Sequence, residues 1–286
     1  MAGKNTVATL FEMKKNGEKI SQLTCYDYTT ACIVDEAGIN TVLVGDSLGM
    51  TMQGYDTTLP VTMEEMIMYG RSVVRGCKNA FVIMDMPFMS YQASVEQAVM
   101  NAGRLIKETG ANAVKLEGGA SVVEQIKAIS QAGIPVCAHI GMTPQSVNAF
   151  GGFKVQGKGE ENARRVLEDA MAVCEAGAFM CVLECVPPKL AALISKKVSM
   201  ITIGIGASAE CDGQVLVYQD MLGMCKGPSP KFVKRFANVG NIMLEAFKEY
   251  DSMVKSMQYP EESHTYIKSD CEDDFLEKLD SEYENM

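Results

Sequence analysis

The chain has 286 residues, 47% of them hydrophobic, and a formal net charge of −10 at pH 7. This apolar content can fill a large core, which excludes a disordered chain, and the negative charge argues against a nucleic-acid-binding protein, which normally presents a basic surface. The ten cysteines contain no Cys-x-x-Cys pair. The chain also shows no apolar leader and no apolar run of about 18 residues, so we expect a cytoplasmic protein with reduced cysteines and no membrane span.

Short apolar segments alternate along the chain with segments of helical periodicity, which is the pattern of repeated strand–helix units. Strands are predicted at residues 22–26, 42–44, 81–84, 113–117, 134–139, 180–183, 200–203 and 215–217. Helices are predicted at residues 4–19, 29–37, 62–75, 94–110, 121–133, 161–176, from 187 onward, and at 231–257. Eight strands followed mostly by helices favour a single-domain (β/α)8 TIM barrel over an open sheet, with an extra helix at each end.

Three of the predicted helices begin with a capping pattern, in which a Ser or Thr precedes a Glu or Gln by three residues. The pattern starts at Thr62, Ser94 and Ser121. Glycines follow two of these helices, at Gly110 and Gly133, where a left-handed C-terminal residue is usual. We therefore expect each of the three helices to begin at its capping residue.

The last 19 residues differ in composition from the rest of the chain. From Lys268 onward, acidic residues outnumber basic ones eight to two. Such a segment has little apolar surface to bury against a core. We expect residues 1–267 to form the catalytic barrel and residues 268–286 to form a mobile acidic tail.

Acidic side chains stand at the ends of four predicted strands, at Asp46, Asp85, Glu117 and Glu184. A single one would be explained equally well by a turn or a helix cap, but four favour a ligand site, because barrels bind ligands at the carboxyl ends of their strands. Carboxylates without His or Cys companions suit Mg2+. The first three are therefore candidate metal ligands, and Glu184 is left as a candidate general base.

Two further residues are candidates, each with a plainer alternative. Lys115 lies two residues before Glu117, so both side chains point to one face of the strand. A lysine directed into a barrel is costly unless it is paired or functional, and a simple salt bridge to one of the acids is the alternative. His139 also ends a strand, and its alternative is a histidine that only supports the site from behind.

Seven longer motifs occupy residues 43–49, 85–91, 114–119, 139–145, 152–157, 183–187 and 211–217. In these motifs, and over about residues 23–266, the chain resembles the ketopantoate hydroxymethyltransferase (3-methyl-2-oxobutanoate hydroxymethyltransferase) family. The resemblance implies a (β/α)8 barrel that uses Mg2+ and 5,10-methylenetetrahydrofolate to convert 3-methyl-2-oxobutanoate to 2-dehydropantoate in pantothenate biosynthesis. It also implies small-molecule partners and a homo-oligomer, typically a decamer.

The resemblance further implies roles for individual residues. It assigns the metal site to Asp46, Asp85 and Glu117, and the contacts with the oxo acid to Asp46, Ser47, Asp85 and Lys115. Glu184 is implied to be the catalytic base. The sequence alone does not indicate which residues bind the folate.

The chain departs from the family pattern at two positions. Gly70 stands where histidine is usual, and Ser208 where glycine is usual. Neither is among the implied site residues, so we expect the activity to be retained, with effects confined to helix stability or folate affinity.

Two other functions compete with this interpretation. A lyase related to isocitrate lyase would share the barrel, but its Lys-Lys-Cys-Gly-His motif is absent. A non-catalytic sensor of an oxo acid or folate would not need the complete set of acids with Lys115.

Overall fold

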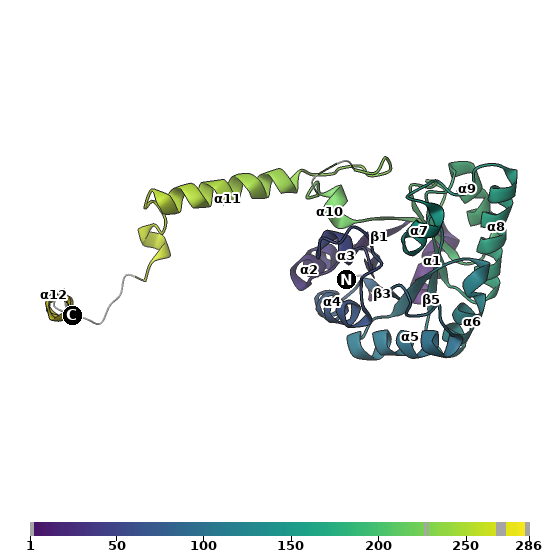
Figure 1. The fold of residues 1–286 in the computed structure, drawn as a ribbon, viewed down its shortest axis with the longest axis horizontal. Coiled ribbons are helices and arrows are strands. Elements are labelled where there is room, and N and C mark those ends of the chain that lie inside the picture. Colours follow the sequence, from purple (N-terminus) through teal and green to yellow (C-terminus); the bar gives the residue numbers. More distant parts are fainter. Residues whose placement is uncertain (1–2, 226, 228, 267–272, 284–286) are drawn as a thin grey trace. The chain divides into compact units, whose positions relative to one another are not determined.

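In the computed structural model, eight parallel strands form a closed barrel in chain order, with helices outside it (Figure 1). The structure describes residues 3–225, 227, 229–266 and 273–283. The pairing of β1 with β8 closes the barrel, so the predicted (β/α)8 architecture is confirmed. The strands are β1 (Ile20–Thr24), β2 (Thr41–Val44), β3 (Phe81–Asp85), β4 (Ala113–Glu117), β5 (Val136–Gly141), β6 (Met180–Glu184), β7 (Ile201–Ile205) and β8 (Gly213–Leu216).

Helices follow most of the strands. The α-helices are α1 (Val7–Asn16), α2 (Tyr28–Glu36), α3 (Leu48–Thr51), α4 (Met63–Gly76), α5 (Val95–Thr109), α6 (Val123–Gln131), α7 (Val147–Phe150), α8 (Glu160–Glu175), α9 (Pro188–Lys197), α10 (Tyr218–Met221), α11 (Val239–Lys255) and α12 (Asp273–Tyr283). The short 3-10 helices among the described residues are η1 (Ala120–Val122), η2 (Pro144–Ser146) and η3 (Glu262–His264).

The three predicted helix caps have different outcomes. Thr62 forms the full capping box of α4, and Ser94 accepts a hydrogen bond from the backbone N–H of Gln97 at the start of α5. The cap predicted at Ser121 is wrong, because α6 begins at Val123 without a side-chain cap. The backbone N–H of Ala120 donates to the side chain of Asp169, and this contact fixes the turn one residue before Ser121. Ser121 therefore lies inside η1.

The N-terminal end of the barrel is closed by apolar packing and by α1. The rings of Phe81 and Phe179 pack edge to face inside it, with their centroids 5.7 Å apart. Leu10 of α1 is fully buried in the same cluster. Lys14 of α1 donates to the carbonyl of Met200, just before β7, over 2.6 Å. The predicted extra helix at the N-terminus is thus part of the barrel floor, and the opposite end carries the polar residues.

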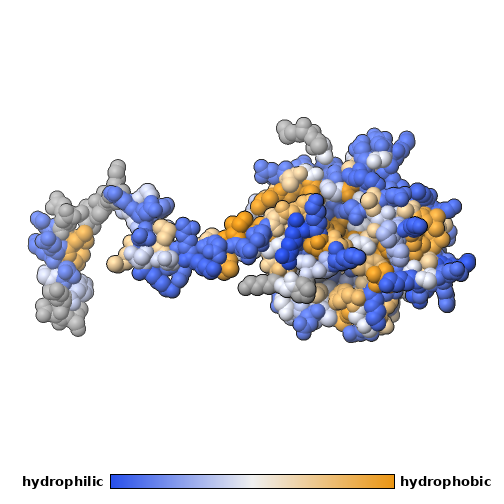
Figure 2. Space-filling view, turned by 90° about the horizontal axis from the view of Figure 1, so that it is seen from above, coloured by the Kyte–Doolittle hydropathy of each residue, from blue (hydrophilic) through white to orange (hydrophobic). Residues whose placement is uncertain are grey.

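The visible surface of the barrel unit is mostly polar, with apolar patches between the charged side chains (Figure 2). Large apolar side chains are strongly exposed on three outer helices, with Ile33 at 63%, Met68 at 56% and Met100 at 64%. Within the described part of the chain, every helix is too short or too polar to cross a bilayer.

The chain divides into two compact units, one up to Ala237 and one from Asn238 onward. The helix predicted over residues 231–257 begins only at Val239, so its first turns were predicted wrongly. The backbone N–H of Phe236 donates to the carbonyl of Met221, and residues 231–237 form an irregular segment within the barrel unit instead.

The second unit contains α11, η3 and α12, and α11 has no buried residue. The acidic tail was predicted to be mobile from residue 268. Residues 268–272 and 284–286 lie outside the described residues, while α12 (Asp273–Tyr283) is helical. The predicted domain boundary after residue 267 stays a prediction.

Removing the tail tests that boundary. Truncation after Lys268 should leave the thermal midpoint and the oligomer size unchanged, because the acidic segment has few apolar residues to contribute to a core. Light scattering and a thermal melt measure both quantities. Smaller oligomers after truncation would instead show that the tail belongs to an interface.

Candidate active site

The carboxyl ends of neighbouring strands bring the predicted acids together. β3 ends at Asp85, β4 at Glu117 and β6 at Glu184, while Asp46 lies two residues beyond β2. In the register of β3 with β4, Asp85 lies beside Lys115. Because all strands are parallel, these side chains meet at one end of the barrel.

Two glycines allow the strand ends to approach this closely. A Cβ at Gly45 would lie 2.8 Å from Oγ of Ser47 and 3.4 Å from Oδ2 of Asp85. At Gly141, φ is 90°, and a Cβ would collide with the carbonyl of Glu184. Larger residues at either position would push the acids apart, so the glycines belong to the construction of the site.

All six predicted site residues line one cavity of about 640 Å³. Oγ of Ser47 lies 2.8 Å from the hydroxyl of Tyr26, which fixes the serine beside Asp46. The cavity wall also has an apolar part, which includes Phe153, Ile205 and Phe232. The volume suits small organic ligands, with the polar and apolar parts recognising different chemical groups.

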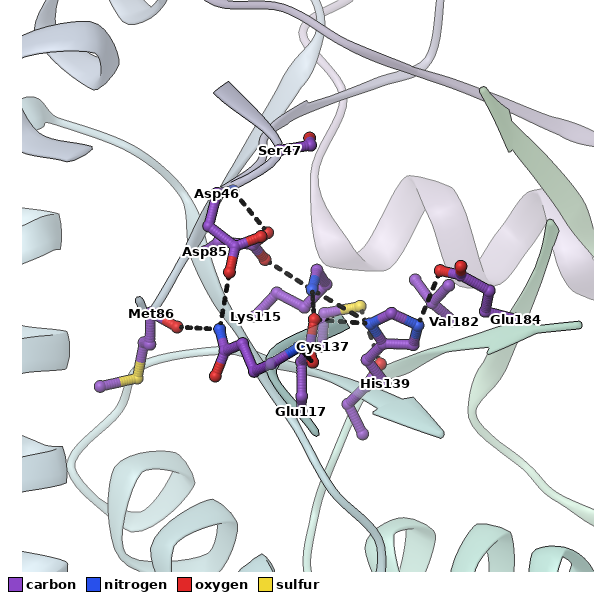
Figure 3. A network of polar contacts seen from close by, with 12 residues as sticks. Asp46, Ser47, Asp85, Met86, Lys115, Glu117, Cys137, His139, Val182 and Glu184 are labelled. Carbon is purple, nitrogen blue, oxygen red and sulfur yellow. Dashed lines mark hydrogen bonds and ion pairs between the residues drawn. The ribbon is translucent and has the colours of Figure 1, made fainter. Parts of the chain in front are cut away.

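Asp46, Asp85 and Lys115 form the first half of the polar cluster (Figure 3). Oδ1 of Asp85 lies 2.7 Å from Nζ of Lys115, and both side chains are only 3% exposed. Oδ2 of Asp85 accepts a hydrogen bond of 3.0 Å from the backbone N–H of Asp46. The sequence left two alternatives for Lys115, a simple salt bridge or a role in the site. Lys115 makes the salt bridge, and it also lines the cavity.

Burial and crowding shift the pKa values in this half of the cluster. Burial raises the pKa of Asp46 well above its usual range, and the charges of Asp85 and Glu117 raise it further. Burial also raises the pKa of Asp85, although Lys115 opposes this shift. Burial alone would lower the pKa of Lys115, but the three carboxylates outweigh it and raise that pKa. For Asp46 and Asp85, the effects of burial and of the neighbouring carboxylates thus exceed the stabilisation that Lys115 gives to their charged forms.

Glu117, His139 and Glu184 form the second half of the cluster (Figure 3). Nδ1 of His139 lies 3.3 Å from Oε1 of Glu117, and its Nε2 lies 3.2 Å from Oε2 of Glu184. Burial and Lys115 lower the pKa of His139, but the two glutamates outweigh them and raise it to about 9. Burial would raise the pKa of Glu117, but His139 and Lys115 lower it below its usual range. At neutral pH, His139 is thus an imidazolium between two carboxylates.

Sequence reasoning missed two buried residues that contact the acids. Gln145 donates from its side chain to Oδ2 of Asp46 and from its backbone to Oε2 of Glu117, over 2.9 Å in each case. The hydroxyl of Tyr91 lies 2.7 Å from Oε1 of Gln145. Both residues lie in the loops that follow β3 and β5, so a polar side chain shortly after a barrel strand was the available signal.

Two of the carboxylates have the character of a metal site. No group of three or more His, Cys, Asp or Glu side chains is spaced as a complete ligand set among the residues that the structure describes. Both oxygens of Glu117 already face positive or donating groups, from His139 and Gln145. Asp46 and Asp85 are adjacent buried carboxylates, joined by the hydrogen bond from the Asp46 backbone N–H to Oδ2 of Asp85, and hard oxygen donors of this kind fit Mg2+.

Removing the Lys115 charge should destabilise the protein. Lys115→Met keeps the chain length but leaves Asp85 and Glu117 without their shared cation, and breaking a buried ion pair costs about 3–5 kcal/mol. The loss should be smaller at pH 5 than at pH 8, because the buried acids can then take up protons. Urea unfolding at both pH values measures this difference. Equal losses at the two pH values would show that Lys115 acts through packing alone.

Sequence comparison identifies relatives over almost the whole chain. Residues 4–262 match the family model described as ketopantoate hydroxymethyltransferase. The 3-methyl-2-oxobutanoate hydroxymethyltransferase of Clostridium novyi is 64% identical, over 92% of this chain and 96% of the relative. The enzyme of the same name from Enterococcus faecalis is 60% identical, over 96% of this chain and 99% of the relative.

Solved structures share the fold at much lower identity. A phosphonopyruvate hydrolase in complex with oxalate and Mg2+ superposes with a TM-score of 0.60 at 10% identity, covering 98% of this chain and 97% of the other. A 2,3-dimethylmalate lyase of the PEP mutase/isocitrate lyase superfamily superposes with a TM-score of 0.59 at 13% identity, covering 99% and 97%. These similarities concern the barrel architecture alone.

Proposed function

The chain belongs to the ketopantoate hydroxymethyltransferase family, and from this premise we propose that it transfers a hydroxymethyl group to 3-methyl-2-oxobutanoate, giving 2-dehydropantoate. The one-carbon donor is 5,10-methylenetetrahydrofolate, and the metal is Mg2+. The observation that best supports this proposal is a single cavity lined by the four acids and Lys115, at the carboxyl end of the barrel.

Lys115 and Ser47 are proposed to bind the oxo acid. The ammonium group of Lys115 lines the cavity and can attract the substrate carboxylate, since opposite charges interact strongly in a buried site. The hydroxyl of Ser47, held by Tyr26, can donate to a substrate oxygen. These two contacts would orient the substrate with its C3 atom toward Glu184, which also lines the cavity.

Glu184 is proposed to remove the C3 proton. It lines the cavity with its side chain 14% exposed, and His139 holds it from behind at 3.2 Å. The electron pair left on C3 forms the new carbon–carbon bond to the one-carbon unit, whose two C–N bonds to the folate break. Water supplies the oxygen and the hydrogen of the new hydroxyl group. Its other proton and the proton taken from C3 end on the two folate nitrogens, so that tetrahydrofolate leaves. A positioned carboxylate is suited to this proton transfer.

Asp46 and Asp85 are proposed to hold Mg2+, with Glu117 as the third residue of the site. When bound, Mg2+ supplies a Lewis acid that polarises the 2-oxo group of the substrate and makes its C3 proton easier to remove. Asp46 and Asp85 support this role because they are buried, adjacent carboxylates. Lys115 balances the rest of the negative charge.

The apolar part of the cavity wall is the surface that we propose for the folate. Phe153 and Phe232 line this part, and aromatic rings stack well on a flat heterocycle such as a pterin.

We further propose that the protein acts in the cytoplasm as a homo-oligomer, specifically a decamer. Support comes from the family membership and from the exposed apolar side chains of Ile33, Met68 and Met100 on the barrel unit, since contacts between subunits would bury such residues. Mass measurement in solution tests the number of subunits.

The test of the function is product formation by the purified protein. With 3-methyl-2-oxobutanoate, 5,10-methylenetetrahydrofolate and Mg2+, we expect 2-dehydropantoate in the mass spectrum, and none when the folate is omitted. Binding of the oxo acid without turnover would instead favour a sensor. Turnover of another oxo acid without folate would favour a lyase.

A further inference from the structure

Gln145 connects two of the acids without lining the cavity. It lies in η2, which two residues separate from the end of β5, and is only 5% exposed. Its Nε2 donates to Oδ2 of Asp46 and to the carbonyl of Met86, each over 2.9 Å, and its backbone N–H donates to Oε2 of Glu117 over 2.9 Å. One residue thus supplies hydrogen bonds to an acid from β4 and to an acid that follows β2.

The orientation of the Gln145 side chain is fixed by its partners. Its Oε1 accepts from the hydroxyl of Tyr91 over 2.7 Å and from Nε2 of Gln92 over 3.1 Å. A flipped amide would place its oxygen against the carbonyl of Met86 and the carboxylate of Asp46, which are both acceptors. The donor therefore faces Asp46, as hydrogen-bond chemistry requires.

Tyr91 ties this amide to β4. The residue is 1% exposed, and its hydroxyl accepts a hydrogen bond of 3.0 Å from the backbone N–H of Glu117. The same hydroxyl has one proton to donate, and its shorter contact is to Gln145. Tyr91 and Gln145 consequently form a buried bridge that ends on both sides in the polar cluster.

The bridge holds one of two neighbouring carboxylates that repel each other. Asp46 and Asp85 are adjacent, buried and of like charge, so the Asp46 carboxylate gains from turning away from Asp85 unless a donor holds it in place. Gln145 provides such a donor from behind. Residues that hold metal ligands in this way typically contribute 10–100-fold to metal affinity.

We propose that Gln145, oriented by Tyr91, is a positioning residue for the divalent cation, holding the carboxylate of Asp46 beside Asp85 and holding Glu117 in place. This inference rests on the proposed Mg2+ site. Neither Gln145 nor Tyr91 lines the cavity, so the bridge acts through the acids and touches no substrate.

Calorimetric titration of Mg2+ into the full-length protein, with saturating 3-methyl-2-oxobutanoate and no folate, tests the proposal. Gln145→Met keeps the side-chain volume, removes the donor, and should weaken Mg2+ binding about 10–100-fold. Tyr91→Phe removes the hydroxyl that orients Gln145, so it should also weaken Mg2+ binding. This second variant can be measured if Gln145→Met does not fold. The double variant should lose no more affinity than the stronger single variant, because both act through one bridge.

Turnover measurements separate positioning from a general structural defect. Raising Mg2+ to saturation should restore kcat in Gln145→Met, whereas a loosened barrel would stay slow. Gln125→Met is the matched control, since Gln125 contacts the backbone of Tyr91 at 3.5 Å but neither acid, and it should keep native Mg2+ affinity.

Three outcomes would overturn the inference: native Mg2+ affinity in Gln145→Met or Tyr91→Phe, losses that multiply in the double variant, or a kcat that Mg2+ does not restore. If the native protein itself binds no Mg2+, the proposed metal site fails together with the inference. Native binding with unaffected variants removes the inference alone.

Discussion

Glu184→Gln should lower turnover by about 10²–10⁴-fold, the usual contribution of a positioned acid or base. Glutamine keeps the size of the side chain but cannot accept the C3 proton of the oxo acid. Proton exchange at C3 in heavy water, followed by NMR without folate, isolates this step from the later transfer. We expect the exchange to slow in parallel with turnover, while the binding of Mg2+ and of the oxo acid changes little.

The matched control for this substitution is Glu168→Gln, which makes the same change at an exposed position of α8. It should leave both rates at their native values. Exchange at the native rate in Glu184→Gln would place the base elsewhere, and His139, 3.2 Å from Glu184, would be the next residue to test. Loss of Mg2+ affinity in this variant would make Glu184 a ligand and not a base.

Removal of the metal should abolish the reaction. A chelator should stop turnover and added Mg2+ should restore it, because the metal polarises the oxo group from which the C3 acidity arises. Asp85→Asn should weaken Mg2+ binding by more than the 10–100-fold expected for a supporting residue. Asp251→Asn, in an exposed ion pair of α11, is the control and should bind Mg2+ normally.

The rival chemistry is a Schiff base on Lys115, as in metal-free aldolases. Lys115 is held by Asp85 at 2.7 Å, and the surrounding acids raise its pKa after outweighing burial, so it is a charged ammonium group and a poor nucleophile. Borohydride should therefore trap no substrate on this residue. A trapped adduct, with turnover that is indifferent to chelator, would contradict the metal site.

The barrel could be predicted because each of its strands and helices has a recognisable pattern within a short stretch of sequence. Each strand is a short apolar run, and eight such runs separated by helical segments leave few alternatives to a closed parallel sheet. The acids could be located for the same reason, since Asp85, Glu117 and Glu184 each end a strand. Parallel pairing then brings side chains that are far apart in sequence to one end of the barrel.

Contacts between loops could not be predicted in this way. Gln145 reaches Asp46 across 99 positions of sequence, and Tyr91 reaches Gln145 across 54. Each follows a barrel strand by a few residues, but the path of these connections, through an irregular segment at Tyr91 and through η2 at Gln145, depends on the completed barrel. The helix predicted from residue 231 failed similarly, since a backbone contact from Phe236 to Met221 competes with helix formation.

The position of His139 could be predicted from the sequence, but its contacts could not. Its place at a strand end was evident, but its two carboxylate neighbours depend on the register of β5 with β4 and β6. Only with Glu117 and Glu184 on either side does the imidazole become a buried cation. The sequence could propose a supporting histidine, and the geometry shows which acids it supports.

The most direct test of the site is a crystal structure of the protein with Mg2+ and 3-methyl-2-oxobutanoate. We expect the cation on the carboxylates of Asp46 and Asp85, the substrate carboxylate near Lys115, and the substrate C3 atom within reach of Glu184. A substrate bonded covalently to Lys115, with no cation at the two aspartates, would contradict this assignment.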